Sequence, residues 1–302
     1  MKFILSIPYL SLVSLSLLLS ACFNDSSVDS SFFGVQWCSL DVWNGHSKAK
    51  ITAGSDDDFY VLDDFSKVFH YKRDPSRICA WNIDNSFGSF GEVSLNGFAE
   101  DMDYNGSSLY YYDGISLLRS GDDSFECAEN ALGKNFALSG KYLVSGDLKG
   151  LNLFELTASG CKKANVTFSG ALRVSAIAIK GNLIATTESI STELKNPERL
   201  VVYDLNGFTP VRNALSGNEN SEMYFCSASR LRFFNTGILL LDKECGKLGV
   251  FDLDGRFIKS LFLADFKIRA VEDMEVLGNE VYFLTNASFY LTYRVELAEL
   301  LR

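Results

Sequence analysis

The 302-residue chain lacks most of the sequence features that mark an enzyme. It has only two histidines, His46 and His70, and no CxxC pair, so a zinc site or a histidine-dependent nucleophile is not indicated. It contains neither a P-loop nor a dinucleotide-binding glycine motif. His70 lies in a strand-like segment, where we expect a half-exposed side chain. These absences favour a protein that is not an enzyme.

Long apolar runs and basic residues are also scarce. Beyond residue 31, charged residues interrupt every apolar stretch before it is long enough to span a membrane. The chain has 28 Lys and Arg against 38 Asp and Glu, which gives a formal net charge of −10 at pH 7. Such a charge repels phosphate, so we expect no nucleic-acid partner and no direct electrostatic binding to anionic lipid.

One apolar segment does occur, at the N-terminus. Lys2 precedes an apolar run over residues 3–19 that is interrupted mainly by serines, a pattern typical of a secretory signal peptide. The Leu-Ser-Ala-Cys sequence at residues 19–22 is similar to the lipobox of bacterial lipoproteins, which implies that Cys22 is lipid-modified. The alternative is an ordinary signal peptide with Cys22 in a disulfide. It is less favoured because the other cysteines already form an even set.

The lipobox resemblance implies three segments. Residues 1–21 are a signal peptide, residues 22–31 are the acylated cysteine with a flexible tether, and residues 32–302 are the folded domain. Diacylglycerol and palmitate chains would anchor the domain to a membrane of the bacterial cell envelope. Phe23 replaces the aspartate that commonly marks retention in the inner membrane, so in a bacterium with two membranes we expect the outer one. The polar tether would span about 15–18 Å.

Beyond Cys22 the chain has six cysteines, an even number that suggests three disulfides in an exported domain. From the count alone, fifteen connectivities are open. The six are Cys38, Cys79, Cys127, Cys161, Cys226 and Cys245.

Helical periodicity is scarce, whereas short period-two segments rich in Val, Ile, Phe and Tyr recur between Gly, Asn, Asp and Ser. Residues 99–111 match residues 271–283 without a gap, and weaker copies surround Gly140, Gly181 and Gly237. The third strands of successive units recur at spacings of 38 to 49 residues. A four-stranded unit at this spacing is typical of a β-propeller blade.

We therefore predict an all-β fold, a six-bladed β-propeller of four-stranded antiparallel blades. The sixth blade lacks an outer strand, which residues 32–40 would supply to close the ring. With its lipobox, the chain resembles exported six-bladed propeller lipoproteins in the style of NHL-type and TolB-type propellers. That resemblance is architectural and implies no particular activity. The predicted blades are residues 49–84, 97–129, 134–168, 172–214, 223–263 and 267–297.

This register favours one disulfide pairing. It brings Cys38 of the closing strand to Cys79 on the outer strand of blade one, and Cys127 to Cys161 on the outer strands of blades two and three. The third pair joins Cys226, where blade four passes into blade five, to Cys245 in a turn of blade five. Each bridge would contribute about 3–4 kcal/mol on the chain-entropy model.

The repeat also duplicates an acidic stretch, at residues 100–103 and 272–275. Both copies would begin innermost strands, so one set of carboxylates is expected to converge on the central axis. Carboxylate oxygens suit Ca²⁺ or Mg²⁺. Alternatively, they bind backbone amides or pair with basic residues between blades. The candidate ligand residues are Glu100, Asp101, Glu272 and Asp273.

Two functions remain. The first is a binding or scaffolding propeller that holds a protein or polymer of the cell envelope. The second is a metal-dependent hydrolase of the lactonase type, in which the acidic residues at the channel mouth hold the cation. We favour the first, because no general base is evident beside the metal.

Overall fold

The computed structural model describes most of the domain. The described residues are 35–40, 49–54, 57–63, 66–77, 79–88, 92–95, 98–128, 132–148, 150–166, 168, 173–189, 191, 196–206, 210–286 and 291–302. The predicted signal peptide, Cys22, the tether and His46 lie outside them. None of the helices in the described part of the chain is long and apolar enough to cross a membrane.

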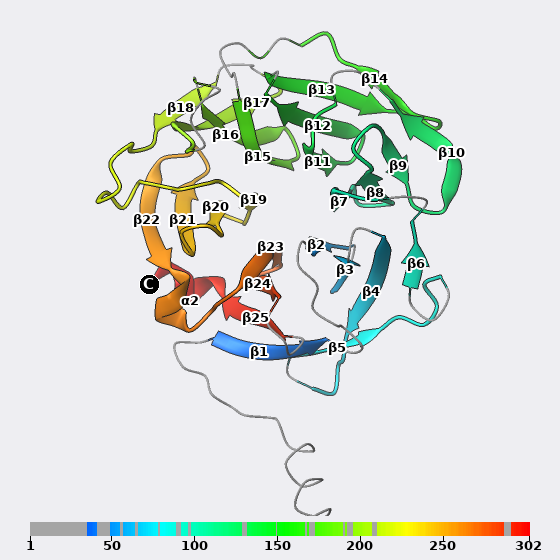
Figure 1. Ribbon diagram of the computed structural model, residues 1–302, viewed down its shortest axis with the longest axis horizontal. Helices are drawn as coiled ribbons and strands as arrows, with labels where there is room; N and C mark the ends of the chain where they lie inside the picture. The colour runs from blue at the N-terminus through cyan, green and yellow to red at the C-terminus, as the bar shows by residue number, and fades with distance from the viewer. Residues whose placement is uncertain are drawn as a thin grey trace, which may run out of the picture.

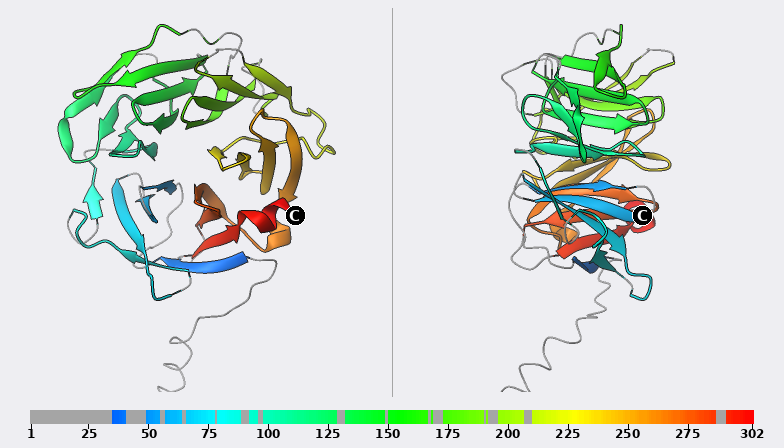
Figure 2. Two further views of the ribbon diagram at one scale, coloured as in Figure 1. Left: turned by 180° about the vertical axis from the view of Figure 1, so that it is seen from behind. Right: turned by 90° about the vertical axis from the view of Figure 1, so that its right-hand side faces the viewer.

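Within these residues the strands form six blades around a central axis, which is the predicted six-bladed β-propeller (Figures 1 and 2). Blade one contains β2 (Lys50–Ala53), β3 (Asp58–Asp63), β4 (Lys67–Arg73), β5 (Ala80–Ile83) and β6 (Glu92–Ser94). Blade two contains β7 (Asp101–Tyr104), β8 (Leu109–Tyr112), β9 (Leu117–Arg119) and β10 (Asp122–Cys127). Blade three contains β11 (Asn135–Ser139), β12 (Tyr142–Asp147), β13 (Gly150–Leu156) and β14 (Cys161–Lys163).

Blades four to six follow the same order from the axis outward. Blade four contains β15 (Arg173–Lys180), β16 (Leu183–Ser189), β17 (Arg199–Asp204) and β18 (Val211–Ala214). Blade five contains β19 (Arg230–Phe233), β20 (Gly237–Asp242), β21 (Lys247–Asp252) and β22 (Phe257–Phe262), followed by the 3-10 helix η1 (Leu263–Phe266). Blade six contains β23 (Val271–Leu277), β24 (Glu280–Thr285), β25 (Leu291–Glu296) and the closing strand β1 (Val35–Leu40). The chain ends in a short helix, α2 (Leu297–Leu301).

Turn glycines link the first two strands of several blades. Gly140 and Gly278 have φ angles of 55° and 61°, in the left-handed region that glycine adopts without steric cost. Gly237 has a different role, because it lies in β20 and a Cβ added there would meet the backbone oxygen of Phe251 at 2.2 Å. The repeat therefore marks the turns correctly, but one of its glycines is required for close packing.

The core consists of apolar clusters between neighbouring blades. Met274 and Phe283 of blade six pack with Leu239 and Leu248 of blade five, and the other junctions of the described residues have comparable clusters. A blade inside the ring is covered on both faces, so most residues of its middle strands are buried. β20 is the extreme case, because all six of its residues are buried.

The N-terminal strand closes the ring as predicted. β1 pairs antiparallel with β25 from Val35↔Val295 to Ser39↔Leu291. It also pairs in parallel with β5 at Ser39↔Ala80, so the sheets of blades six and one are continuous. Sequence patterns did not indicate this second pairing.

The three predicted disulfides are all present. Their Cα–Cα distances are 4.6 Å for Cys38–Cys79, 5.1 Å for Cys127–Cys161 and 5.8 Å for Cys226–Cys245, within the usual range for disulfides. The first joins blades one and six, the second joins blades two and three, and the third ties blade five to the connector that precedes it.

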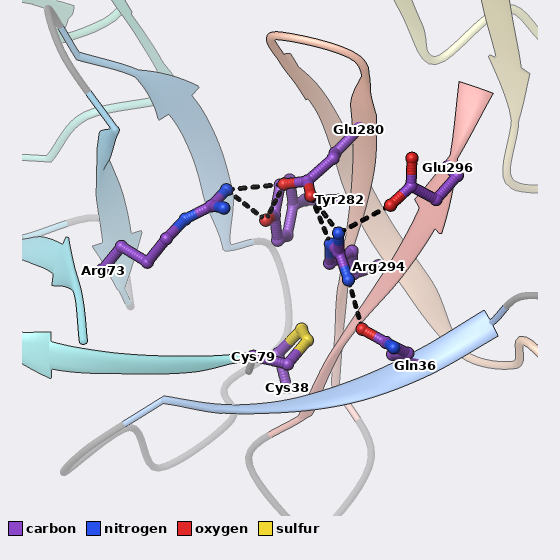
Figure 3. The surroundings of a disulfide bond; sticks show 8 residues. All are labelled: Gln36, Cys38, Arg73, Cys79, Glu280, Tyr282, Arg294 and Glu296. Atoms are coloured by element: carbon purple, nitrogen blue, oxygen red, sulfur yellow. Dashed lines mark hydrogen bonds and ion pairs between the residues drawn. A yellow bond between two sulfur atoms is a disulfide. The ribbon is translucent and has the colours of Figure 1, made fainter. Parts of the chain in front are cut away.

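A polar network lies beside the Cys38–Cys79 bridge (Figure 3). Arg294 of β25 bonds Glu280 on β24 and Gln36 on β1, while Arg73 of β4 donates to Glu280 at 2.5 Å. The hydroxyl of Tyr282 donates to the same carboxylate at 2.6 Å. Burial raises the pKa of Glu280, but Arg294, Tyr282 and Arg73 more than offset this and lower it. The carboxylate therefore stays ionised and links both sides of the closure.

Candidate functional site

The innermost strands of three blades carry charged residues toward the axis at alternate positions. Asp101 and Asp103 lie on β7, Arg230 and Arg232 on β19, and Asp273 and Glu275 on β23, all six of them buried. Alternation along a strand directs the two residues of each pair to the same side. We call these six residues the axial network.

The first layer of the axial network centres on Arg230. Its Nε and Nη2 donate to both carboxylate oxygens of Asp273, at 2.8 and 2.6 Å, and its Nη1 donates to Asp101 at 3.0 Å. Asp273 also accepts a hydrogen bond from the backbone N–H of Ile51 in blade one, at 2.9 Å. One guanidinium thus joins blades two, five and six, in the bidentate geometry that arginine forms with carboxylates.

The second layer centres on Arg232. Its Nε donates to both oxygens of Glu275, at 2.8 and 2.7 Å, whereas its Nη2 lies 3.9 Å from Asp103 and has no hydrogen-bond partner. Asp103 instead accepts from the Thr52 hydroxyl at 2.9 Å and from the backbone N–H of Leu138 at 2.8 Å. Blades one and three are joined to the network in this way.

The two layers differ electrostatically. Burial alone would raise the pKa of Asp273, but the charges of Arg230 and Lys50 more than offset it, so that pKa is lowered. Burial also opposes the charge on Arg230, yet Asp101 and Asp273 hold its pKa well above the usual value. At Glu275 burial prevails over Arg232, and Asp103 adds repulsion, so the pKa of Glu275 is raised.

The four predicted ligand residues separate into two groups. Asp101 and Asp273 do converge on the axis, and both are bound by Arg230. Glu272 instead pairs with Lys243 at 3.0 Å and accepts from Asn286 at 2.6 Å, while Glu100 is exposed. This arrangement is the alternative in which the carboxylates pair with basic residues between blades.

Sequence reasoning missed both arginines, although a signal was present. They lie in the repeat copy around Gly237, at alternate positions of an inner strand, as the acidic residues do in the other copies. In that copy the glycine stands after the turn, as the first residue of β20, so alignment on the glycines shifts Arg230 by two residues relative to Asp101.

The described residues contain one cluster with the spacing of a metal site, Cys226, Asp242 and Cys245. Both sulfurs are in a disulfide, and Asp242 accepts the backbone N–H groups of Cys226 and Cys245 at 2.6 and 3.1 Å. The three side chains of this cluster therefore stabilise a loop rather than provide ligands for a metal ion.

The expectation for His70 was wrong, because the side chain is buried in blade one. Its Nε2 contacts Asp58 at 2.8 Å and its Nδ1 contacts Asp84 at 3.0 Å, while its ring stacks on Tyr60. With both nitrogens bound to carboxylates, His70 has none left to deprotonate a nucleophile. Its role is to hold the outer edge of the blade, where the Asp84 N–H also donates to the His70 carbonyl.

A cavity of about 610 Å³ lies on the axis where the N-terminal ends of the innermost strands meet. We call it the channel mouth. Such a volume is within the range of small-molecule sites, about 300–1,000 Å³. Its charged lining residues are Lys50, Glu100, Lys134, Arg173, Lys243 and Glu272.

Comparisons with known proteins agree with this fold and assign no family. No family model matches the chain, and no curated protein matches it. Hsv2 from Kluyvelomyces marxianus has a similar structure, with a TM-score of 0.50 and 12% identity over 80% of this chain and 70% of that chain. BamB from Moraxella catarrhalis has a TM-score of 0.45, with 11% identity over 81% and 85% of the two chains. Glutaminyl cyclase from Myxococcus xanthus has a TM-score of 0.43, with 9% identity over 86% and 93%. At these identities the likeness concerns the fold alone.

Proposed function

We propose that this protein is a lipid-anchored propeller of the bacterial cell envelope that binds or scaffolds a protein or polymer without transforming it. The observation that carries the binding role is the axial network. Arg230 and Arg232 neutralise carboxylates that a hydrolase of the lactonase type would need for its metal. The channel mouth above them remains open to a ligand.

The anchor is supported by the sequence of residues 1–31 and by the position of β1. The lipobox-like sequence ends at Cys22, and β1 begins at Val35. The short polar segment between them would hold the ring close to the bilayer.

We expect metabolic labelling with an alkyne fatty acid to mark the full chain in a bacterium with two membranes, and the labelled protein to float with outer-membrane vesicles. Cys22→Ser should abolish the label and release the protein, because no other residue would carry the lipid. A Cys226→Ser plus Cys245→Ser variant is the control for thiol loss and should remain labelled. Labelling that persists in Cys22→Ser would refute the anchor.

A further inference from the structure

The outer strand of blade five, β22, differs from the outer strands of the other described blades. It has six residues and one charged side chain, Lys259. β6 and β14 have three residues each, β18 has four, and β10 carries three acidic residues. The outer strand of blade six, β1, is paired on both sides. Proteins commonly shorten or charge their edge strands to prevent pairing with other chains, and β22 is neither short nor highly charged.

The backbone of β22 has an open edge toward the outside of the ring (Figure 1). Among the described strands it pairs with β21 alone. The Leu263 N–H donates to the Gly246 carbonyl at 2.8 Å, and bonded and non-bonded pairs alternate along antiparallel strands. Leu261 therefore directs its N–H and C=O toward β21, whereas Ser260 and Phe262 direct theirs outward. These outward groups have no other hydrogen-bond partner within the described part of the chain.

Apolar side chains accompany this open edge. Ile258 and Phe262 are each 54% exposed, whereas every residue of β20 in the same blade is buried. The Lys247 ammonium lies 5.7 Å from the centre of the Phe262 ring, which positions that ring at the edge. An edge of this kind accepts an extended peptide as an added strand. Main-chain hydrogen bonds then supply affinity, and alternate side chains supply specificity.

Charge indicates which chain the edge accepts. Lys259, in the middle of β22, is half-buried and has no ion pair among the described residues. Two copies of β22 paired about a twofold axis at Ser260 would bring their Lys259 side chains to diagonal positions on one face, where like charges repel. The net charge of −10 on each chain adds to this repulsion. A different chain that places a carboxylate opposite Lys259 would be attracted instead.

We propose that the outer edge of β22 binds an extended segment of a partner protein, which joins blade five as a fifth strand, with a carboxylate beside Lys259 and apolar side chains beside Ile258 and Phe262. The contact lies on the rim of the ring, apart from the channel mouth, so this inference goes beyond the binding role proposed above. Lys259 gives the contact its specificity, because it disfavours a copy of β22 and favours an acidic strand.

The probe is a head-to-tail cyclised β-hairpin whose outward strand reads Val-Thr-Val-Glu-Val, since cyclisation removes most of the entropy cost of ordering a strand. In antiparallel pairing its glutamate lies opposite Lys259 and its central valine opposite Ser260. A second hairpin carries lysine in place of the glutamate, and a third has an N-methyl group on the central valine. The fluorescence anisotropy of each labelled hairpin is titrated with the full chain in lipid nanodiscs.

We expect saturable binding of the glutamate hairpin, about fivefold tighter than binding of the lysine hairpin, because an attraction is replaced by a repulsion. The N-methyl hairpin should bind at least about tenfold more weakly, since it lacks a main-chain donor. Lys259→Glu should reverse the order of the first two hairpins, which also shows that the variant is folded. Lys162→Glu, an exposed substitution on the outer strand β14, should leave both affinities within about twofold.

Hydrogen exchange at single-residue resolution locates the contact. Binding of the glutamate hairpin should slow exchange of the Ser260 and Phe262 amides, which face outward. Exchange of the Leu261 amide should stay the same, because that N–H already donates to β21.

No binding of the glutamate hairpin, equal binding of the glutamate and lysine hairpins, or protection outside β22 would overturn the proposal. If the parent chain sediments as a dimer in detergent, with Ser260 and Phe262 protected before any hairpin is added, the edge belongs to a second copy and the proposal is also overturned. Fatty-acid labelling at Cys22 and ligand binding at the channel mouth do not depend on β22, so failure here leaves the proposed function standing.

Discussion

Arg230 shows that a buried ion pair in this protein fixes the relative positions of the blades more than it stabilises the fold. Removing two carboxylates and a guanidinium from water costs about as much as their attraction returns, so the intact cluster contributes little net free energy. Its geometry is nonetheless demanding, because three blades must be in place for all of the hydrogen bonds to form.

The Arg230→Met variant should lower the free energy of unfolding by about 3–5 kcal/mol at pH 7, since two buried carboxylates lose their cation. In the parent the pKa of Asp273 is lowered, so the stability it adds above its ordinary pKa is lost as pH falls. In the variant Arg230 no longer offsets burial, so the pKa of Asp273 should rise, and the cost of its buried carboxylate is relieved as pH falls. The difference in the free energy of unfolding between parent and variant should therefore become smaller from pH 7 to pH 4.

Urea unfolding across this pH range measures the difference. Arg256→Met is the matched control, because Arg256 is exposed and pairs with Asp254 at 3.3 Å on the surface. Its effect should stay below about 1 kcal/mol at every pH. If the loss of unfolding free energy in Arg230→Met is the same at every pH, then ionisation of Asp101 and Asp273 does not determine that loss.

Sequence analysis found two of the six residues of the axial network. The duplicated acidic stretches identified Asp101 and Asp273, together with Glu100 and Glu272, which lie outside the network. Their basic partners were missed, because the repeat copy around Gly237 is degenerate and alignment on its glycine shifts Arg230 by two residues. Only the closed ring brings β19 beside β23 and shows that Arg230 meets Asp273.

At the level of elements, the outer edge of blade one is shared by two short strands. β4 pairs with β5 through residues 71–73 and with β6 through residues 67–69. Blade registers derived from a repeat assume one outer strand, so β6, with three residues, was not predicted. The division leaves β5 free to pair with β1 on its other side, which joins the closing strand to both neighbouring blades.

The Cys38–Cys79 disulfide should stabilise β1 against local opening by more than its loop length alone indicates. Cys38→Ser with Cys79→Ser should cost about 4 kcal/mol, and Cys226→Ser with Cys245→Ser about 3 kcal/mol, on the chain-entropy model. Only the first pair tethers β1. Amide hydrogens of β1 should therefore exchange much faster in the first variant, while those of β24 change in proportion to global stability.

Hydrogen exchange followed by mass spectrometry separates the two effects. Protection of β1 that is equal in the two variants would mean that β25 pairing and the Arg294 network close the ring without the disulfide.

At the scale of the whole molecule, the six-bladed architecture was predictable because each blade repeats one local pattern. A short strand, a turn and a second strand recur at a blade's spacing, and the missing outer strand of the last repeat indicated that the N-terminal segment closes the ring. The contacts between blades were harder to predict, because they depend on which side chains of two neighbouring repeats meet in the folded ring. Trp81 and Tyr282, which pack edge to face between blades one and six, are 201 residues apart in sequence.

Divalent cations should leave the melting temperature of the domain unchanged, because Arg230 and Arg232 already neutralise the converging carboxylates. A bound ion at a hundred times its dissociation constant would add about 2.7 kcal/mol, a shift of a few degrees for a domain of this size. Calorimetric melts with millimolar Ca²⁺ or Mg²⁺ and with EDTA make the comparison. A cation-dependent rise that disappears in Glu100→Gln with Glu272→Gln would restore the hydrolase hypothesis.

The position of the Cys38–Cys79 bridge has a mechanical consequence. If Cys22 is held in a membrane, any pull on the domain enters through Val35, the first residue of the strand that closes the ring. Tension can peel only residues 35–37 from β25, about 10 Å of chain, before it reaches a covalent bond. Beyond that point the force divides between blade six, through β25, and blade one, through β5. The site of ring closure, where a propeller would otherwise open first, is thus covalently linked at the point that receives a force applied to the N-terminal segment.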